Sequence, residues 1–144
     1  MQQAAPTMGL QTQIINATTI GEINAAFATM ARERPDAMFV APDALFTSRR
    51  VQLITLTARD RIPAIYASRD SVEAGGLMSY GPDLTEMFRQ IGIYSGRILN
   101  GAKPTDLPVL QSTKFELVIN LTTAQALGLT IPAGVISIAD EVIE

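Results

Sequence analysis

The sequence predicts an α/β domain with a parallel sheet, and three observations support that prediction. Continuous apolar runs at residues 37–41 and 62–67 are typical of strands that are buried on both faces. Helical patterns separate the strand-like runs, as in parallel sheets with right-handed crossovers. Capping signals stand where two of these helices should begin.

The N-terminal segment predicts a short strand at residues 12–15 followed by a helix. Thr19 and Glu22 have the spacing of a capping box, with Thr19 at the N-cap. The helix should end near Pro35. Its apolar positions recur at helical spacing and form one stripe: Ile20, Ile23, Phe27 and Met30.

The middle of the chain predicts a helix at 47–60, a helical turn at 70–74 and a strand at 77–80. The first helix should bury Val51, Leu53, Ile54 and Ala58. A second capping box at Asp83 and Glu86 predicts a long helix that stops at Asn100. We expect that helix to bury Leu84, Met87, Phe88, Ile91, Tyr94, Ile98 and Leu99.

The C-terminal part has a different pattern. Residues 114–120 alternate, so Phe115, Leu117 and Ile119 should share one face of a half-buried strand. A short helix at 122–127 follows, and residues 135–144 fit either a strand or a helical turn.

Composition narrows the classes of function. The chain has 144 residues, 47% hydrophobic and 17% charged, which indicates one globular domain with a hydrophobic core. Its net charge of −3, without a basic stripe, argues against nucleic acid as a partner. It has no Cys and no His, which removes the commonest nucleophile–base pairs and transition-metal ligands. We therefore expect no cofactor, no metal and no enzymatic activity.

The N-terminus has no basic region followed by an apolar stretch, and no apolar run is long enough to span a bilayer. As it stands, the chain is expected to have no signal peptide and to be cytoplasmic.

Ligands of parallel α/β sheets bind beyond the carboxyl ends of the strands, near a switch in strand order. Here those ends are residues 42–44, 68–70 and 80–82. Asp43 fits two interpretations, a partner for a ligand ammonium or hydroxyl group and a helix cap. Arg69 likewise fits either a grip on a carboxylate or a solvated loop charge.

Three aromatic residues lie near the same ends. Aromatic rings there stack on flat ligands or belong to the core. Tyr66 lies inside a strand and is expected in the core. Phe46 fits either role, and Tyr80, just before Gly81, is more open to a ligand or hinge role.

Six sequence blocks carry a resemblance to a known family. They are PDALF (42–46), RIPAIY (61–66), EAGGLMSYGPD (73–83), ILNGAKP (98–104), DLPV (106–109) and FELVIN (115–120). In their order and spacing they resemble the ABC-transporter substrate-binding proteins similar to TrpX, which are type I periplasmic binding proteins.

The resemblance implies a parallel-sheet, Rossmann-like lobe of a protein whose two lobes close on a small solute such as an amino acid. Residues 1–80 would be an incomplete second lobe, and residues 81–144 the hinge crossing and elements that return to a missing first lobe. It also implies an ABC permease as partner and a periplasmic location. The ligand-binding residues expected in this half are Asp43, Phe46, Thr47, Ser68, Arg69 and Tyr80.

The apolar stripe at 84–99 would face a sheet that this chain does not contain. Burying one Leu or Phe side chain stabilises a protein by roughly 1.5–3 kcal/mol. We therefore expect self-association, as a homodimer with exchanged or mutually covered elements.

Two rival interpretations stay open. One is an oligomeric scaffold or degenerate fragment that binds no ligand, and the other is a small α/β enzyme. The enzyme is disfavoured because the candidate side chains contain no nucleophile–base pair.

Overall fold

The computed structural model describes residues 5–109 and 114–144. The chain divides between Pro35 and Asp36 into two compact units. All five strands and every helix except the first two lie in the second unit.

The N-terminal unit contains the 3-10 helix η1 (Pro6–Met8) and helix α1 (Ile20–Glu33). The predicted cap is confirmed, because Thr19 Oγ1 accepts a hydrogen bond from the Glu22 amide at 3.2 Å. The Glu22 carboxylate reaches back one residue further than a standard capping box, to the Thr18 amide at 2.6 Å. The buried residues of α1 are Ile23, Phe27 and Met30, as the stripe predicted.

The strand predicted at residues 12–15 is wrong. These residues have no regular secondary structure, and Ile14 is exposed. A strand needs a neighbour for its backbone hydrogen bonds, and no described strand pairs with this segment.

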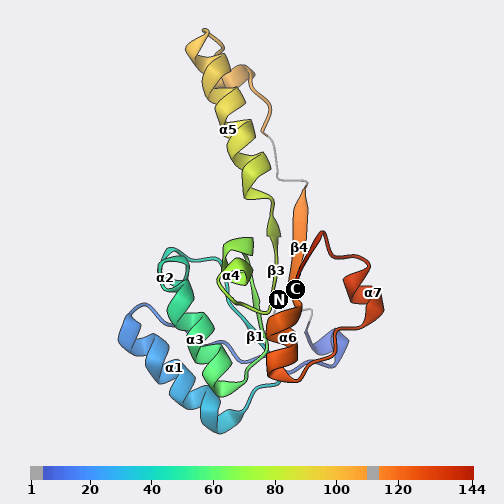
Figure 1. The fold of residues 1–144 in the computed structure, drawn as a ribbon. Helices are drawn as coiled ribbons and strands as arrows, with labels where there is room; N and C mark the ends of the chain where they lie inside the picture. Colours follow the sequence, from blue (N-terminus) through green and yellow to red (C-terminus); the bar gives the residue numbers. More distant parts are fainter. Residues whose placement is uncertain (1–4, 110–113) are drawn as a thin grey trace. The chain divides into compact units, whose positions relative to one another are not determined.

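The second unit is built on a five-stranded sheet with the order β1-β2-β3-β4-β5 (Figure 1). The strands are β1 (Met38–Phe39), β2 (Ala64–Tyr66), β3 (Met78–Pro82), β4 (Phe115–Asn120) and β5 (Glu141–Ile143). The first three are parallel, β4 is antiparallel to β3, and β5 is parallel to β4. The predicted α/β class with a mostly parallel sheet is confirmed. Because the order of the strands in residues 5–109 and 114–144 is sequential, these strands contain no switch in strand order of the kind expected beside the site.

Strand β1 is shorter and less buried than its apolar run predicted. Phe39 is 43% exposed, although Val40 just beyond it is buried. The reason is position, because β1 is the edge strand and has only β2 as a neighbour.

The predicted helix at 47–60 is two helices, α2 (Ala44–Ser48) and α3 (Arg50–Asp60), which meet at Arg49. Leu53 and Ile54 are buried as expected. Val51 is 63% exposed and Ala58 is also exposed, whereas Thr57 is buried. The buried face of α3 is formed by Leu53, Ile54 and Thr57, and Val51 and Ala58 lie at its margin, so the predicted stripe was rotated toward solvent.

Helix α4 (Arg69–Glu73) follows β2 and lies close to the predicted turn. The core includes Val72 from this helix and Val118 and Ile119 from β4, all almost fully buried. Asn120, also buried, donates a hydrogen bond from Nδ2 to the Val72 carbonyl at 3.4 Å. Packing therefore joins α4 to the far end of β4.

Helix α5 (Leu84–Leu99) has the predicted bounds, but none of its residues is buried, so the predicted burial of its stripe is wrong within this chain. It is followed by the 3-10 helix η2 (Pro104–Asp106). The Tyr94 hydroxyl donates to the Pro108 carbonyl at 2.6 Å, which fixes the returning segment against the helix.

The C-terminal part contains α6 (Leu121–Leu127) and α7 (Ala133–Ile136) between β4 and β5. Gly128 closes α6 in the left-handed conformation, with φ of 76°. Residues 135–144, for which the sequence allowed either a strand or a helical turn, contain the end of α7 and the strand β5.

Candidate functional site

The carboxyl ends of three strands lead directly into helix caps. Asp43 follows the β1 end and caps α2, Ser68 follows β2 and caps α4, and Asp83 follows β3 and caps α5. Each side chain accepts a hydrogen bond from an amide in the first turn of its helix. The site predicted from the strand ends is therefore a row of capped turns.

Asp43 is well suited to its cap. Its Oδ1 accepts from the Leu45 amide at 2.7 Å, and its carbonyl accepts from the Thr47 hydroxyl at 2.9 Å. Phe46 on the same turn is half-buried. The cap interpretation of Asp43 is confirmed, while ligand contacts of Asp43, Phe46 and Thr47 stay predictions.

Arg69 lies among carboxylates. Its Nε donates to Glu73 Oε1 at 2.9 Å and its Nη2 to Glu141 Oε2 at 2.8 Å. Its Nη1 lies 3.8 Å from Glu116 Oε2. The hydrogen bonds to Glu73 and then Glu141 raise the pKa of Arg69. Arg69 is thus an ion-paired residue at the start of α4 and not a loop charge, while its contact with a ligand stays a prediction.

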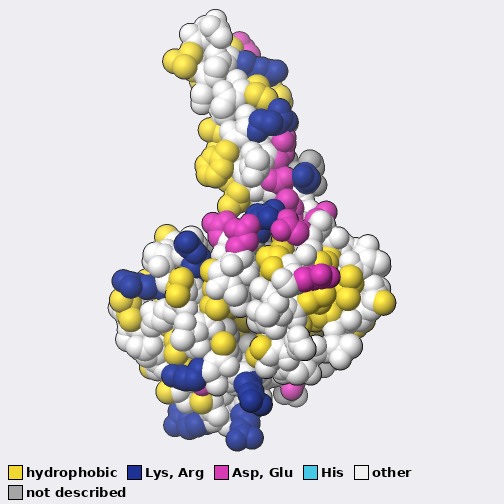
Figure 2. All heavy atoms as spheres, viewed as in Figure 1, with side chains coloured by type: hydrophobic (Ala, Val, Ile, Leu, Met, Phe, Trp, Pro, Cys, Tyr) yellow, Lys and Arg dark blue, Asp and Glu magenta, His cyan; other side chains and the backbone are white. Residues whose placement is uncertain are grey.

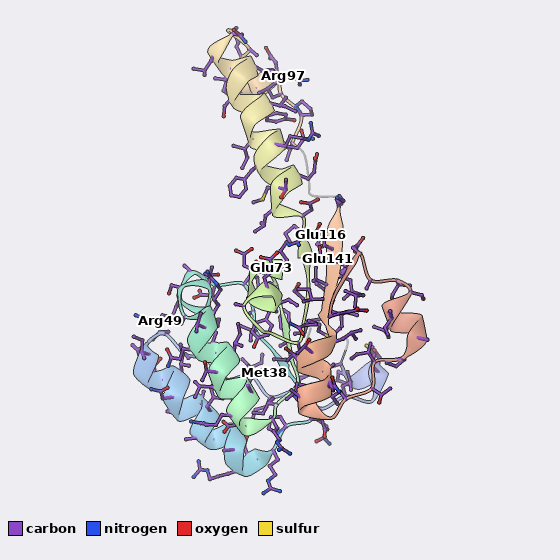
Figure 3. All side chains as sticks on the ribbon, in the orientation of Figure 1. Met38, Arg49, Glu73, Arg97, Glu116 and Glu141 are labelled. Atoms are coloured by element: carbon purple, nitrogen blue, oxygen red, sulfur yellow. The ribbon has the colours of Figure 1, made fainter. Side chains whose placement is uncertain are left out.

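We call Arg69, Glu73, Glu116 and Glu141 the Arg69 cluster. Figure 3 shows its three carboxylates near one another, on α4, β4 and β5. Acidic side chains also gather on the surface in this region (Figure 2). A ligand carboxylate that binds Arg69 would have to approach a guanidinium already surrounded by three protein carboxylates, which is a constraint that the sequence did not reveal.

Tyr80 lies on the face of the sheet opposite the Arg69 cluster. Gly81 pairs with Glu116 across β3 and β4, so position 81 shares a face with that carboxylate. A Cβ at Gly81 would lie 1.9 Å from the Ala67 carbonyl oxygen, so this face is turned toward the β2–α4 connection. Side chains alternate along a strand, and Tyr80 therefore points the other way.

On its own face Tyr80 stacks against Phe115. The ring centroids are 5.6 Å apart and the planes differ by 20°. Phe115 was expected to share a face with Leu117 and Ile119, but the stacking of its ring on Tyr80 was not predicted. The alternation of residues 114–120 was the available signal, and the missing information was the register of β4 on β3.

Asp83 and Lys114 connect the chain at the end of β3 to the chain at the start of β4, one residue beyond Pro82 and Phe115. The Asp83 amide donates to the Lys114 carbonyl at 3.0 Å, and Lys114 Nζ donates to Asp83 Oδ2 at 2.7 Å. The hydrogen bond from Lys114, followed by that from the Glu86 amide, holds the pKa of Asp83 below its ordinary value. One carboxylate thus caps α5 and joins the two strands.

Two cavities stand out, and neither contains the predicted site residues. One, of about 10 Å³, is lined by residues of α3, the Gly75–Leu77 segment and α6, and is too small for a solute. The other is an open apolar groove of about 410 Å³ between α5 and residues 104–109. Within residues 5–109 and 114–144, no three metal-ligating side chains gather, and no helix has the length and apolar character to cross a membrane.

Comparison with known proteins gives a family. A family model described as ABC transporter substrate binding protein matches residues 1–143. The comparison with curated proteins gave no match.

Solved structures give the same fold. A conserved domain protein from Vibrio cholerae is 28% identical, with a TM-score of 0.87 over 98% of this chain and 47% of that chain. An ABC domain in complex with L-Trp from Streptococcus pneumonia is 30% identical, with a TM-score of 0.87 over 98% of this chain and 49% of that chain.

A ligand-free, open substrate-binding protein with adhesive properties from Clostridium difficile is 24% identical. Its TM-score is 0.68, over 99% of this chain and 47% of that chain, and it shows the fold alone. The present chain spans about half the length of the structures that it matches.

Proposed function

Because the chain belongs to the ABC transporter substrate-binding protein family, we propose that it binds a small solute, such as an amino acid, for an ABC permease. The observation that carries this proposal is the row of connections at the carboxyl ends of β1, β2 and β3, where α/β sheets bind ligands. The L-Trp bound to the Streptococcus pneumonia structure supports an amino acid as the class of solute.

We place the solute at this row of connections, in reach of Asp43, Phe46, Thr47, Ser68, Arg69 and Tyr80. Tyr80 and Arg69 lie on opposite faces of the sheet, and the other four residues lie in or beside the capped turns. A small solute would therefore contact the capped turns or the Tyr80 face, or lie across the edge where β3 leaves the sheet.

The lobe arrangement belongs to the same proposal. We assign residues 1–80 to a second lobe and the crossing near residues 80–83 to a hinge. Because β4 and β5 lie in one sheet with β1–β3, we assign residues 115–144 to this lobe too, which corrects the expectation that they return to a first lobe. The Asp83–Lys114 pair supports the crossing, since it joins β3 and β4 where both strands end. Helix α5 and the segment after it, with no buried residue in α5, form the surface that would face a first lobe.

We also propose that the chain works in the periplasm, as a binder and not as an enzyme. The sequence has no His and no Cys, and the strand-end residues Asp43 and Arg69 are engaged in a helix cap and in ion pairs. Neither arrangement activates a nucleophile.

The last part of the proposed function is self-association of the chain through helix α5. Figure 2 shows hydrophobic side chains along α5. Its most exposed apolar residues are Phe88, Ile91 and Leu99. If a homodimer covers this face, sedimentation velocity at micromolar concentration should show the sedimentation coefficient of a dimer. A chain that is monomeric at that concentration contradicts the proposed self-association.

The experiment that tests the function is thermal unfolding of the chain with each of the twenty L-amino acids. A ligand that binds only the folded state at 100 times its Kd stabilises it by about 2.7 kcal/mol. A rise in Tm with one or a few amino acids supports the proposal. No rise with any of them favours the alternative, an oligomeric scaffold without a ligand.

A further inference from the structure

The stacked rings of Tyr80 and Phe115 form a surface that the family assignment does not explain. Tyr80 is 55% exposed and Phe115 is 45% exposed, so about half of each side chain remains open to solvent. Their centroid distance of 5.6 Å lies within the range of favourable aromatic pairs. We call these two residues the aromatic pair.

The backbone under the aromatic pair is held on both strands. Tyr80 is paired with Leu117, and Pro82 with Phe115, so the two rings are diagonal neighbours on one face. The two hydrogen bonds between Asp83 and Lys114 lie one residue beyond. The backbone that carries both rings is therefore fixed before any ligand arrives, which lowers the entropic cost of binding.

The same face is kept apart from the charges of the Arg69 cluster. Glu116 pairs with Gly81 and points to the other face, where it lies 3.8 Å from Arg69. The exposed parts of the two rings thus offer an aromatic, apolar surface, and the ions of the cluster do not compete for it. Such a surface favours a planar ring over a branched aliphatic or charged group.

From this geometry we infer that Phe115 is a specificity-determining residue, which with Tyr80 binds a planar ring of the solute. The inference rests on the proposed function and names the part of the solute that this face selects. Phe115 contacts the ring directly and also holds the Tyr80 ring in its stacked orientation.

The experiment compares L-tryptophan with L-leucine as probes. The chain contains no Trp, so the fluorescence of added L-tryptophan reports its own binding, and calorimetry measures both probes. Phe115→Leu removes the ring and keeps an apolar side chain, and Phe115→Tyr keeps the ring. Phe39→Leu is the matched control, because Phe39 is also a strand residue and is 43% exposed.

We expect Phe115→Leu to weaken L-tryptophan binding by about 3- to 10-fold, on the scale of one aromatic contact. L-Leucine binding should not change, so the ratio of the two affinities falls. Phe115→Tyr and Phe39→Leu should leave the ratio of the L-tryptophan and L-leucine affinities equal to that of the unaltered chain. A purely structural role of Phe115 would weaken both probes equally.

The inference is overturned if Phe115→Leu leaves the ratio unchanged. It is also overturned, with the proposed function intact, if the unaltered chain binds only solutes without a ring. If the unaltered chain binds no amino acid at all, both fail. Thermal unfolding of each variant shows whether it is folded, and Phe115→Tyr keeps the test valid if Phe115→Leu does not fold.

Discussion

Arg69 and Glu141 lie 72 positions apart in the sequence, yet their side chains meet in a hydrogen bond of 2.8 Å between Nη2 and Oε2. The same guanidinium contacts Glu73 and Glu116, so one cation joins α4, β4 and β5. The C-terminal strand is thereby linked to a helix that follows β2.

We predict that Arg69→Met destabilises the chain by about 1 kcal/mol or less, because exposed ion pairs contribute little individually. The informative result is its salt dependence. Without the guanidinium, three neighbouring carboxylates repel one another, and salt screens that repulsion. Urea unfolding should therefore show a lower free energy of unfolding for Arg69→Met at low salt, and a value close to that of the unaltered chain at 0.5 M NaCl.

Arg89→Met is the matched control for this experiment. Arg89 also forms an ion pair, with Glu86 three residues before it on α5, but its removal leaves no such group of carboxylates. A recovery with salt of equal size in both variants would contradict the role given to the cluster.

Local features were predictable from the sequence. The caps at Thr19 and Asp83 and the bounds of α5 depend on residues a few positions apart, and the structure confirms them. Gly128 ends α6 for an equally local reason, its left-handed backbone.

Contacts between distant residues were not predictable from the sequence. Stacking of Tyr80 on Phe115 follows from the register of β4 on β3, and alternation alone does not set a register. The position of β1 at the sheet edge likewise follows from strand order, so its apolar run wrongly indicated burial on both faces. Of the candidate site, the strand ends were predictable, but the partners of Arg69 were not.

Gly81 is predicted to accept no side chain. A Cβ there would lie 1.9 Å from the Ala67 carbonyl oxygen, so Gly81→Ala forces β3 away from the β2–α4 connection. We expect a loss of about 1–3 kcal/mol, the usual cost of overpacking, in urea unfolding.

The matched control is Gly92→Ala on α5. A Cβ at Gly92 meets nothing within 4 Å, and alanine stabilises an exposed helix position by about 0.5–1 kcal/mol. If the free energy of unfolding falls for Gly81→Ala and rises for Gly92→Ala, the close approach of Gly81 to Ala67 is supported. A neutral Gly81→Ala would show that this approach does not exist.

Thr57 and Tyr66 form a buried pair whose hydroxyl oxygens are 3.2 Å apart. Burial raises the pKa of Tyr66, and the hydrogen bond with Thr57 opposes that rise. Thr57 Oγ1 also donates to the Ile54 carbonyl at 2.9 Å, so Tyr66→Phe leaves Thr57 one partner and should cost about 0.5–1.5 kcal/mol. Thr57→Val instead leaves the Tyr66 hydroxyl buried without this hydrogen bond and should cost about 1–3 kcal/mol.

Thr57→Val with Tyr66→Phe should cost less than the sum of the two single substitutions, because both polar groups are then absent. A double-mutant cycle in urea unfolding measures this difference. Thr55→Val is the control, since Thr55 is an exposed residue of α3 whose hydroxyl bonds only to the backbone of Val51. Additivity of Thr57→Val and Tyr66→Phe would show that the hydroxyls do not interact.

The Asp83–Lys114 pair predicts a loss of stability in acid. Because the pKa of Asp83 is lower in the folded chain than in the unfolded one, its contribution is complete above the unfolded value of about 3.9. That contribution is lost as the pH falls through the depressed value of the folded chain. Glu86, whose pKa is lowered to about 2 by Arg89 and Gln90, extends the loss further into acid.

Lys114→Met separates the two carboxylates. It removes the cation from Asp83 and leaves the partners of Glu86 in place, so the pKa of Asp83 should rise while that of Glu86 stays low. Carboxyl carbon shifts followed by NMR from pH 6 to pH 1.5 measure both groups. An unchanged midpoint for Asp83 in Lys114→Met would show that the helix cap alone sets its pKa and that the Lys114 ammonium does not stabilise the carboxylate.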